Sequence, residues 1–416
     1  MRNLEEAKRV QRAVIYKNGV AAATIERNAR TGVVFSYLPA YLDAGGQAIA
    51  ATLPALNTPV KLAHGTVPAF FAGLLPEGER LAKLRWMVKT TLADEMSLLI
   101  AAGQDPVGDV QILPSGATPA EPEPLAMLPA DLSDFSFARF DAGAGPVDPS
   151  SLPGVQNKVS AGLLGARGRD RFILKMDSPG RPHQVAAEYL LLTKARALGV
   201  SVVQPRLLTD AGGAKALLLP RFDRTTAGRL AVEDGAQLLG LTPGRKNDVS
   251  AEAVAGAVIN RCAAGPLAAR NVYLLFLFAW LTGNGNLHAK NISVLQHATG
   301  EWLVAPAYDL QCTLAADVEE GIAAGVPGGI LTDLTDGDPS RDPGMALRLG
   351  GSRTRLDRAE WLRFARALNL PERLAAKCIT KALAASLLTA AELPFEREVS
   401  SAVVRVLAAR RAPMEP

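Results

Sequence analysis

The chain has 416 residues, of which 48% are hydrophobic and 21% charged, so it is long enough for two or three globular domains. Its net charge of +4 is small and the basic residues are dispersed, which argues against a dedicated nucleic-acid-binding face. Three widely separated cysteines without a CxxC pair argue against a zinc site or a disulfide framework. A charged N-terminus without an apolar run predicts no signal peptide, and the expected location is a reducing cytoplasm.

The first section, residues 1–115, is expected to be a β-rich subdomain. Alternating apolar residues predict strands over 13–16, 20–25 and 33–38, with a tight hairpin turn at Lys17-Asn18-Gly19. Two helical stretches follow: residues 70–86 must break near Pro76, and an amphipathic helix over 92–102 ends at Gly103. A short strand over 109–113 completes this section.

Residues 116–131 have the composition of a linker. They contain four prolines and no apolar periodicity that would support a helix, which is typical of an extended and semi-rigid spacer. The prolines are Pro119, Pro122, Pro124 and Pro129.

The second half begins with strands and continues with helices. Strands are predicted over 158–164, 171–176 and 214–219, and a helix over 184–198 ends at Gly199. From residue 233 the periodicity is mainly helical, apart from a hairpin of strands 292–295 and 302–304. The longest apolar stretch, 272–281, is too short to span a bilayer. Near the C-terminus, Arg405, Arg410 and Arg411 close a predicted helix and are expected to offset its dipole.

This order of elements predicts an α+β fold of the protein-kinase type with two lobes. The N-terminal β-rich subdomain, residues 1–115, and the linker, residues 116–131, would precede a kinase N-lobe over residues 132–225. A large helical C-lobe would follow over residues 226–416.

The loop from Gly283 to Asn291 carries the most specific chemical pattern. Asn286 and Asn291 are five residues apart, the spacing of the proton-accepting Asp and the magnesium-binding Asn in a kinase catalytic loop. Asp309, 18 residues after Asn291, supplies a carboxylate where a second metal ligand belongs. The alternative, a set of ordinary turn residues, is disfavoured by this spacing. His288 fits a buried core histidine as well as it fits a functional role.

An amide at position 286 affects catalysis more than binding. Asparagine has the shape of aspartate but cannot accept the hydroxyl proton, and loss of a general base typically costs about 10²–10⁴-fold in rate. ATP and Mg²⁺ binding should survive, because Lys175, Asn291 and Asp309 are present. The chain is therefore predicted to bind nucleotide without efficient phosphoryl transfer.

Two further residues are candidates for nucleotide binding. Lys175 ends an apolar strand and would reach the α- and β-phosphates, although a solvent-facing lysine at a strand end is the alternative. Glu188, on the next predicted helix, would hold that lysine by an ion pair, and its alternative is a solvated helix face.

Two loops are weaker candidates. The segment Ser151-Leu152-Pro153-Gly154-Val155-Gln156-Asn157-Lys158 precedes the lysine strand and would offer backbone N–H groups to phosphates, whereas a plain turn is the alternative. Pro220 and Phe222 fall where a kinase hinge would bind adenine, and here too a simple turn is the alternative.

At these residues the chain resembles the HipA family of bacterial toxin serine/threonine kinases. The matching motifs occur in family order along nearly the whole chain, which makes the resemblance specific. They are residues 74–78, 151–158, 173–175, 221–224, Glu233-Asp234, His288-Ala289-Lys290-Asn291, Pro306-Ala307-Tyr308-Asp309 and 345–351.

The resemblance implies a role for each matching residue. Ser151 would be autophosphorylated, Lys175 would contact ATP, and Asn291 and Asp309 would bind Mg²⁺. The remaining nucleotide-binding set would comprise Pro153, Gly154, Val155, Gln156, Asn157, Lys158, Glu188, Pro220, Phe222, His288 and Tyr308.

The resemblance also implies partners. They are a HipB-like helix-turn-helix antitoxin, through which alone DNA is contacted, and a protein substrate among translation components, such as an aminoacyl-tRNA synthetase. No membrane partner is implied.

The departure from the family is Asn286, where the pattern has aspartate. A deliberate substitution in a toxic kinase and a natural pseudokinase that acts with a DNA-binding antitoxin both remain open, and the first is favoured because every other part is kept. A small-molecule kinase of similar fold is a third, weaker alternative. Phosphorylation by an Asn286→Asp form would distinguish them.

Overall fold

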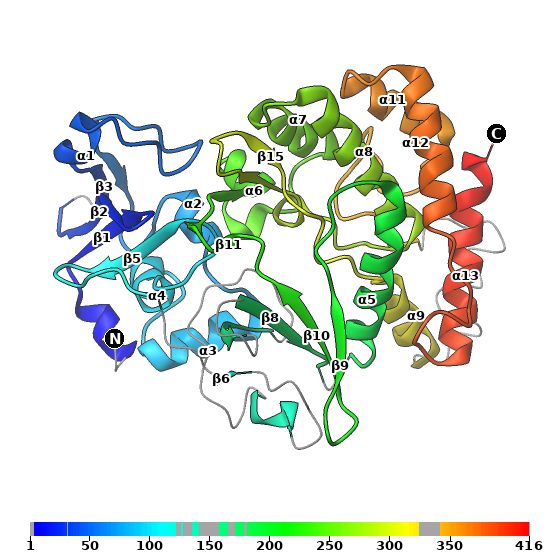
Figure 1. Ribbon diagram of the computed structural model, residues 1–416, viewed down its shortest axis with the longest axis horizontal. Helices are drawn as coiled ribbons and strands as arrows, with labels where there is room; N and C mark the ends of the chain where they lie inside the picture. Colours follow the sequence, from blue (N-terminus) through cyan, green and yellow to red (C-terminus); the bar gives the residue numbers. More distant parts are fainter. Residues whose placement is uncertain are drawn as a thin grey trace. The chain divides into compact units, whose positions relative to one another are not determined.

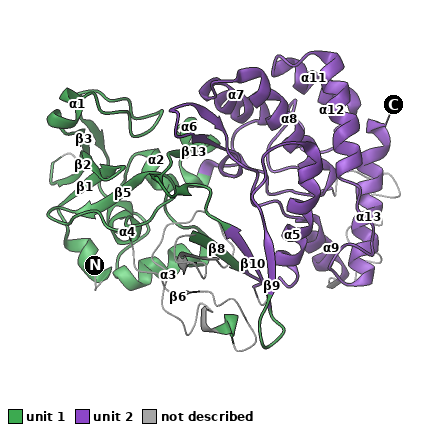
Figure 2. Cartoon of the chain, viewed as in Figure 1, with its two compact units in different colours: residues 1–175, 209–214, 220–244 green, residues 176–208, 215–219, 245–416 purple. Residues whose placement is uncertain are grey.

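The computed structural model describes residues 4–30, 32–121, 126–127, 135–140, 158–164, 171–178, 181–323 and 342–415 (Figure 1). The chain divides into two compact units (Figure 2). Unit 1 comprises residues 1–175, 209–214 and 220–244, and unit 2 comprises residues 176–208, 215–219 and 245–416.

Unit 1 begins with a five-stranded antiparallel sheet in the order β4-β3-β2-β1-β5. The Asn-Gly turn between β1 and β2 forms as predicted, because Asn18 (φ 48°) and Gly19 (φ 77°) both take left-handed backbone angles. The elements are η1 (Leu4–Arg9), β1 (Arg12–Lys17), β2 (Val20–Asn28), β3 (Gly32–Tyr37), α1 (Pro39–Asp43), β4 (Val60–Leu62), α2 (Ala69–Gly73), α3 (Gly78–Val88), α4 (Glu95–Ala102) and β5 (Val110–Pro114).

The predicted break near Pro76 is confirmed, since α2 ends at Gly73 and α3 begins at Gly78. The prediction for the next helix is partly wrong. α4 begins at Glu95 after the N-cap Asp94 and is not amphipathic, because every residue from Met96 to Ala102 is buried. Burial on all sides follows from its position between the sheet and the other helices of this unit.

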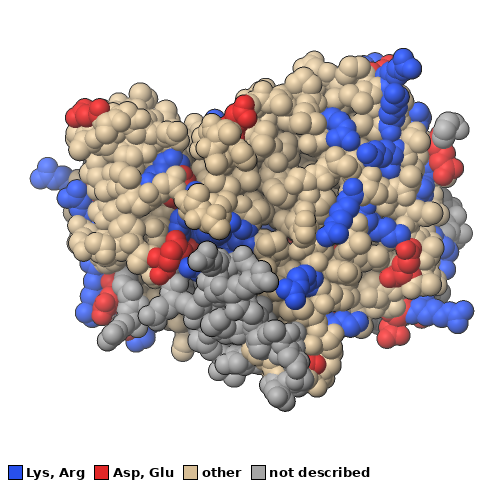
Figure 3. Space-filling view, in the orientation of Figure 1, with Lys and Arg blue, Asp and Glu red and all other residues tan. Residues whose placement is uncertain are grey.

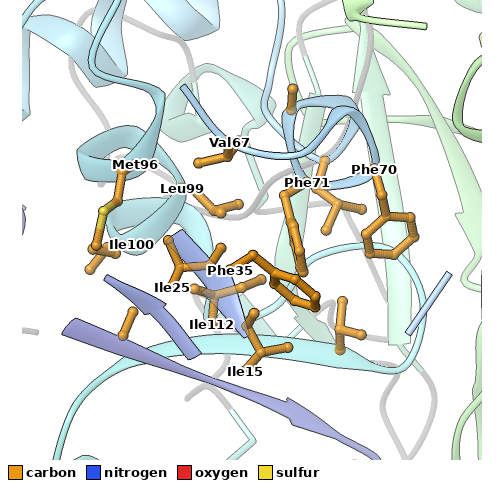
Figure 4. Close-up of a cluster of buried hydrophobic side chains, with 14 of the residues drawn as sticks. Ile15, Ile25, Phe35, Val67, Phe70, Phe71, Met96, Leu99, Ile100 and Ile112 are labelled. Atoms are coloured by element: carbon orange, nitrogen blue, oxygen red, sulfur yellow. The ribbon is translucent and has the colours of Figure 1, made fainter. Parts of the chain in front are cut away.

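Figure 4 shows the hydrophobic cluster that these elements enclose. Ile15, Ile25 and Phe35 come from the sheet, and Phe71 packs edge-on and tilted against the neighbouring rings Phe70 and Phe35. All of these side chains are at most 3% exposed. The predicted β-rich N-terminal subdomain therefore has a core of its own.

The rest of unit 1 consists of short strands and turns. β6 pairs in parallel with β7, and β7 pairs antiparallel with β8. β11 and β12 form a small hairpin, and α6 begins with a capping box made by Asp234 and Gln237. The elements are β6 (Ala126–Met127), η2 (Phe137–Phe140), β7 (Lys158–Leu164), β8 (Arg171–Met176), β11 (Arg224–Thr225), β12 (Gly228–Arg229), β13 (Val232–Asp234) and α6 (Gly235–Leu238).

Unit 2 is mainly helical, as predicted for the second half of the chain. The short η4 (Pro243–Arg245) ends at the first residue of the last segment of this unit. The other elements are α5 (Gln184–Ala195), η3 (Arg196–Leu198), β9 (Arg206–Thr209), β10 (Lys215–Pro220), α7 (Ala251–Arg261), α8 (Gly265–Leu281), η5 (Ala289–Asn291), β14 (Ser293–Gln296), β15 (Trp302–Val304), α9 (Leu314–Ala323), α11 (Arg358–Ala367), α12 (Glu372–Ala385), α13 (Arg397–Arg411) and η8 (Ala412–Met414).

α8 is the central helix of unit 2. Pro266 lies in its first turn, and all residues from Val272 to Leu281 are buried, so the helix is apolar on every side. Tyr273 packs edge-on against Trp361 of α11, and Phe276 does the same against Phe364. This packing fixes the C-terminal end of α8, where the loop predicted to carry the chemistry begins.

On the face shown in Figure 3, lysines and arginines lie in several separate groups and acidic residues are interspersed. Within the described ranges, the helices are all too short or too polar to cross a bilayer.

Candidate functional site in the loop after α8

The loop after α8 begins with a glycine that no other residue replaces easily. Gly283 has φ +70°, and a Cβ at this position would lie 2.9 Å from Cβ of Leu314. Thr282 ends the helix, and its hydroxyl donates to the carbonyl of Phe278 (2.7 Å). The glycine therefore allows the chain to turn sharply while it touches the start of α9.

Hydrogen bonds then fix the backbone as far as Asn286. The N–H of Asn284 donates to the carbonyl of Ala279 (2.8 Å), and the N–H of Asn286 donates to Oδ1 of Asn284 (2.9 Å). The N–H of Gly285 donates to the hydroxyl oxygen of Thr313 (2.8 Å). Asn284 is 1% exposed, whereas Asn286 is only half-buried. The first asparagine is thus a structural residue and the second is partly accessible.

Asn291 closes the loop on itself. Its Nδ2 donates to the carbonyl of Asn286 (2.8 Å), and its N–H donates to the carbonyl of His288 (2.9 Å). His288 is 6% exposed and its N–H also donates to the carbonyl of Asn286 (2.8 Å). The spacing of five residues therefore brings Asn286 and Asn291 together, as the sequence predicts.

Tyr308 brings the second predicted segment to the same place. Its hydroxyl donates to the carbonyl of Lys290 (2.9 Å) and lies 2.6 Å from the hydroxyl oxygen of Ser293. Since Tyr308 precedes Asp309 and Lys290 precedes Asn291, this contact joins the immediate neighbours of both predicted metal ligands.

Asp309 has an unusual backbone conformation. Its φ is +55°, which is uncommon for a residue other than glycine, and its side chain is 6% exposed. Oδ1 accepts a hydrogen bond from Nε2 of Gln311 (3.2 Å). Conformations of this kind are retained at functional sites, where the surrounding structure enforces them.

The donor atoms fit a magnesium ion. Asn291 donates a hydrogen bond through Nδ2 within the loop, and this bond does not use its Oδ1. Asp309 adds an anionic oxygen. Mg²⁺ prefers oxygen ligands and is commonly held by one or two carboxylate or amide oxygens together with substrate phosphates. The residue types therefore match that metal rather than a transition metal.

Lys175 and Glu188 are both buried, contrary to their solvent-exposed alternatives. Lys175, at the end of β8 in unit 1, is 3% exposed, and Glu188, on α5 in unit 2, is 0% exposed. Charged side chains this deeply buried require compensating interactions, so neither residue is a solvated surface charge.

The predicted phosphate loop falls mostly outside the described part of the chain. Ser151, Pro153, Gly154, Val155, Gln156 and Asn157 lie outside the described residues. Lys158 is the first residue of β7, and its backbone lies opposite Lys175 in the register of β7 and β8.

The predicted hinge segment is tied to the N-terminal part of unit 1 by buried ion pairs. Arg221 contacts Asp105 (2.7 Å) and Asp223 (2.8 Å), and Arg224 contacts the same two carboxylates (both 2.7 Å). Asp223 also accepts the N–H of Gly108 (2.9 Å). Pro220 and Phe222, the residues predicted to line the nucleotide, are half-buried between these anchors.

These arginines control the charge of the buried carboxylates. Burial alone would raise the pKa of Asp223, but Arg221 and Arg224 more than offset this effect and hold the pKa well below its usual range. The pKa of Asp105 is lowered against burial by the same two arginines and by Arg229. The cluster therefore stays ionised at neutral pH.

The sequence did not reveal which residues support the backbone of the loop. Thr313 and Asn284 both bind its backbone, and Lys290 is 3% exposed within it. For Asn284, its position between Gly283 and Gly285 was an available signal, because a side chain between two glycines can bond to the adjacent backbone. Thr313 lies 28 residues from its partner, and no local pattern marks it.

Two family models match successive parts of the chain. Residues 13–113 match the model of the HipA N-terminal domain, and residues 150–389 match that of the HipA-like C-terminal domain. Y4dM of Sinorhizobium fredii, whose name marks it as a candidate kinase, is 29% identical over 337 residues, which cover 74% of this chain and 78% of that protein. The serine/threonine-protein kinase toxin HipA of Shewanella oneidensis is 26% identical over 296 residues, 62% of this chain and 66% of that protein.

The fold has a solved counterpart. The structure of Shewanella oneidensis HipA, determined with HipB and its operator DNA, matches with a TM-score of 0.69 over 96% of both chains at 19% identity. This likeness shows the predicted kinase-like fold.

Proposed function

This chain belongs to the HipA family, and we propose that its fold serves transfer of the ATP γ-phosphate to a serine or threonine of a protein, with Ser151 as its own acceptor. The observation that carries the proposal is the closed loop of Asn286 and Asn291, joined through Tyr308 to the segment of Asp309. A kinase site needs such a fixed set of oxygens next to the position that orients the acceptor hydroxyl.

Each of these residues has a defined task in the proposal. Asn291 and Asp309 hold Mg²⁺, which when bound neutralises charge on the ATP phosphates. Lys175 binds the phosphates, and Glu188 keeps that lysine in place. Pro220, Phe222, His288, Tyr308 and the segment from Ser151 to Lys158 complete the nucleotide contacts. These assignments rest on the resemblance to the family and on residue type, and the burial of Lys175, Glu188, His288 and Asp309 supports them for those residues.

Asn286 makes this form of the chain inactive in the proposal. Its half-buried amide occupies the place of the proton acceptor but carries no charge and cannot take the hydroxyl proton. Its backbone N–H and its carbonyl are both hydrogen-bonded within the loop. We therefore expect a carboxylate of the same shape to fit there without rearrangement of the backbone.

The test is Asn286→Asp with labelled ATP and Mg²⁺. We expect label on Ser151 in this variant and none in the present form, and the double variant Asn286→Asp, Lys175→Met is the control that must lose it. If Asn286→Asp binds ATP but transfers no label to itself, to a translation component such as an aminoacyl-tRNA synthetase, or to any other protein, the kinase proposal is wrong.

A second candidate function is a natural pseudokinase. The observation that points to it is Asn286, which cannot accept a proton, whereas Lys175, Asn291 and Asp309 are the parts that binding alone requires. Such a protein would bind ATP and act with a helix-turn-helix antitoxin, as HipA of Shewanella oneidensis is found with HipB and operator DNA. Its test is whether ATP changes the affinity of this chain and its antitoxin for operator DNA without any transfer of phosphate.

A further inference from the structure

Arg410, in the last turn of α13, does not have the surface role expected of it. The sequence assigns it to the helix dipole together with Arg405 and Arg411, but its side chain is 4% exposed and its bonds lead away from its own helix. Nη1 donates to the carbonyl of Trp280 (3.0 Å), and the guanidinium lies over the indole ring of Trp280, 4.1 Å from its centroid.

The carbonyl of Trp280 belongs to the last turn of α8. The last four carbonyls of a helix lack the usual partner within the helix. The carbonyl of Trp280 accepts a long hydrogen bond from the N–H of Gly283 (3.4 Å), and Arg410 donates a second, shorter one immediately before the turn at Gly283. The end of α8, and with it the start of the loop, is thus attached to the C-terminal helix of the chain.

Arg410 also holds a second segment that touches the loop. Its Nε donates to Oδ2 of Asp342 (3.2 Å), and its Nη2 pairs with Oδ1 of the same carboxylate. Oδ1 of Asp342 also accepts the N–H of Gly344 (2.8 Å). A bidentate arginine–carboxylate pair of this kind fixes the orientation of both side chains.

Gly344 lies directly against Gly285. A Cβ added to Gly285 would be 3.2 Å from the carbonyl oxygen of Gly344 and 2.8 Å from the hydroxyl oxygen of Thr313. The loop is therefore confined at Gly285 by two neighbours, and one of them is held in place through Asp342 by Arg410.

We infer that Arg410 is a positioning residue for the loop that carries Asn286. It acts through two routes, the carbonyl of Trp280 on one side and Asp342 with Gly344 on the other, and it does not touch the nucleotide or the acceptor itself. Lysine cannot replace it fully, because an ammonium group cannot form the fork with Asp342, donate to Trp280 and stack on the indole at the same time.

The primary test is amide hydrogen exchange in the chain as it stands, so it does not depend on the proposed activity. We compare Arg410→Met and Arg410→Lys with Arg411→Met, which removes the neighbouring arginine, whose Nη1 donates to the hydroxyl oxygen of Ser386 (3.0 Å). In Arg410→Met the amides of residues 284–286 should exchange roughly tenfold faster or more, the factor that loss of a charge-assisted hydrogen bond produces in a local opening equilibrium. Arg410→Lys should fall between, and Arg411→Met should leave these amides unchanged.

Two outcomes overturn the inference: unchanged exchange at residues 284–286 in Arg410→Met, or an equal increase throughout unit 2, which would indicate general destabilisation. If Arg410→Met does not fold, Asp342→Asn breaks the second route alone and should still speed exchange at residues 284–286 and 344.

Kinase activity provides a second test of the role of Arg410, and this test rests on the proposed function. In the Asn286→Asp background, Arg410→Lys should lower kcat by a larger factor than it raises KM for ATP, because its two routes end at residues 284–286, which orient the acceptor, and not at His288 or Asn291. A rise in KM without a fall in kcat would contradict it. If Asn286→Asp is itself inactive, the proposed function fails, while the exchange result still decides the role of Arg410.

Discussion

Nδ2 of Asn291 donates a hydrogen bond to the carbonyl of Asn286, 2.8 Å away. One asparagine side chain thus fixes the backbone at the position where a kinase keeps its proton acceptor, and in the proposed site its Oδ1 would bind Mg²⁺. Suitable substitutions separate the observed structural role of this residue from the proposed ligand role.

Substitution of Asn291 should affect the metal-dependent part of ATP binding. Asn291→Ala removes both the donor and the oxygen, so we expect the increase in ATP affinity produced by Mg²⁺ to be largely lost. Asn291→Asp retains an oxygen ligand and should keep this increase. Titration of each variant with ATP, with and without Mg²⁺, measures the effect, and Asn260→Ala on the exposed side of α7 is the control. An Asn291→Ala variant that binds Mg²⁺-ATP like the parent would exclude a ligand role.

Tyr308→Phe should destabilise unit 2. The substitution leaves the carbonyl of Lys290 and the hydroxyl of Ser293 without their common partner, which costs about 1–3 kcal/mol in the free energy of unfolding. Thermal unfolding should shift down by several degrees, whereas Tyr189→Phe, on a half-buried face of α5, should change it little. Equal melting temperatures for the two variants would show that the hydrogen bonds of the Tyr308 hydroxyl to Lys290 and Ser293 contribute nothing to stability.

Asp223→Asn should be among the most destabilising single changes in unit 1. It removes the charge that compensates Arg221 and Arg224 in a buried site, and breaking a buried ion pair typically costs about 3–5 kcal/mol. Denaturant unfolding gives the value. The matched control is Asp248→Asn, whose partner Arg245 is solvent-exposed at 3.6 Å, and where we expect a loss below about 1 kcal/mol.

The same cluster predicts the acid limit of the fold. The pKa values of Asp105 and Asp223 are lower in the folded chain than in the unfolded chain, where an aspartate titrates near ~3.9. The unfolded state therefore binds more protons, and the stabilisation is complete above that pH and is lost as the pH falls toward the folded pKa values. Unfolding free energies measured from pH 7 down to about 3 should fall steeply below about pH 4. Asp223→Asn should show a shallower fall, and an equal slope in both proteins would contradict this account.

Local patterns predicted the local features of this chain. The Asn18-Gly19 turn, the break at Pro76, the hairpin of β14 and β15 and the compact loop from Asn286 to Asn291 all depend on residues close in sequence. The kinase-like fold followed from the order of these elements and from the family motifs, and the solved counterpart bears it out.

Features that depend on distant residues were not predictable in this way. The sequence predicts an amphipathic helix over 92–102, yet Ser97 of α4 is fully buried, where its hydroxyl bonds to Asp94 and Arg27. For Glu188 the sequence leaves a solvated helix face as the alternative, and the structure shows the residue at 0% exposure. Arg410 was assigned to a helix dipole, although its partner Asp342 is 68 residues away.

The bonds from Arg221 and Arg224 to Asp105 cross more than a hundred positions of sequence. A truncated protein that starts after residue 115 would leave both guanidinium groups short of a counter-ion and would remove the Gly108 amide that Asp223 accepts. The region matched by the HipA N-terminal domain model therefore cannot be removed without breaking buried ion pairs of the remaining chain. Chimaeras with another family member must exchange residues 105–108 and 221–224 together.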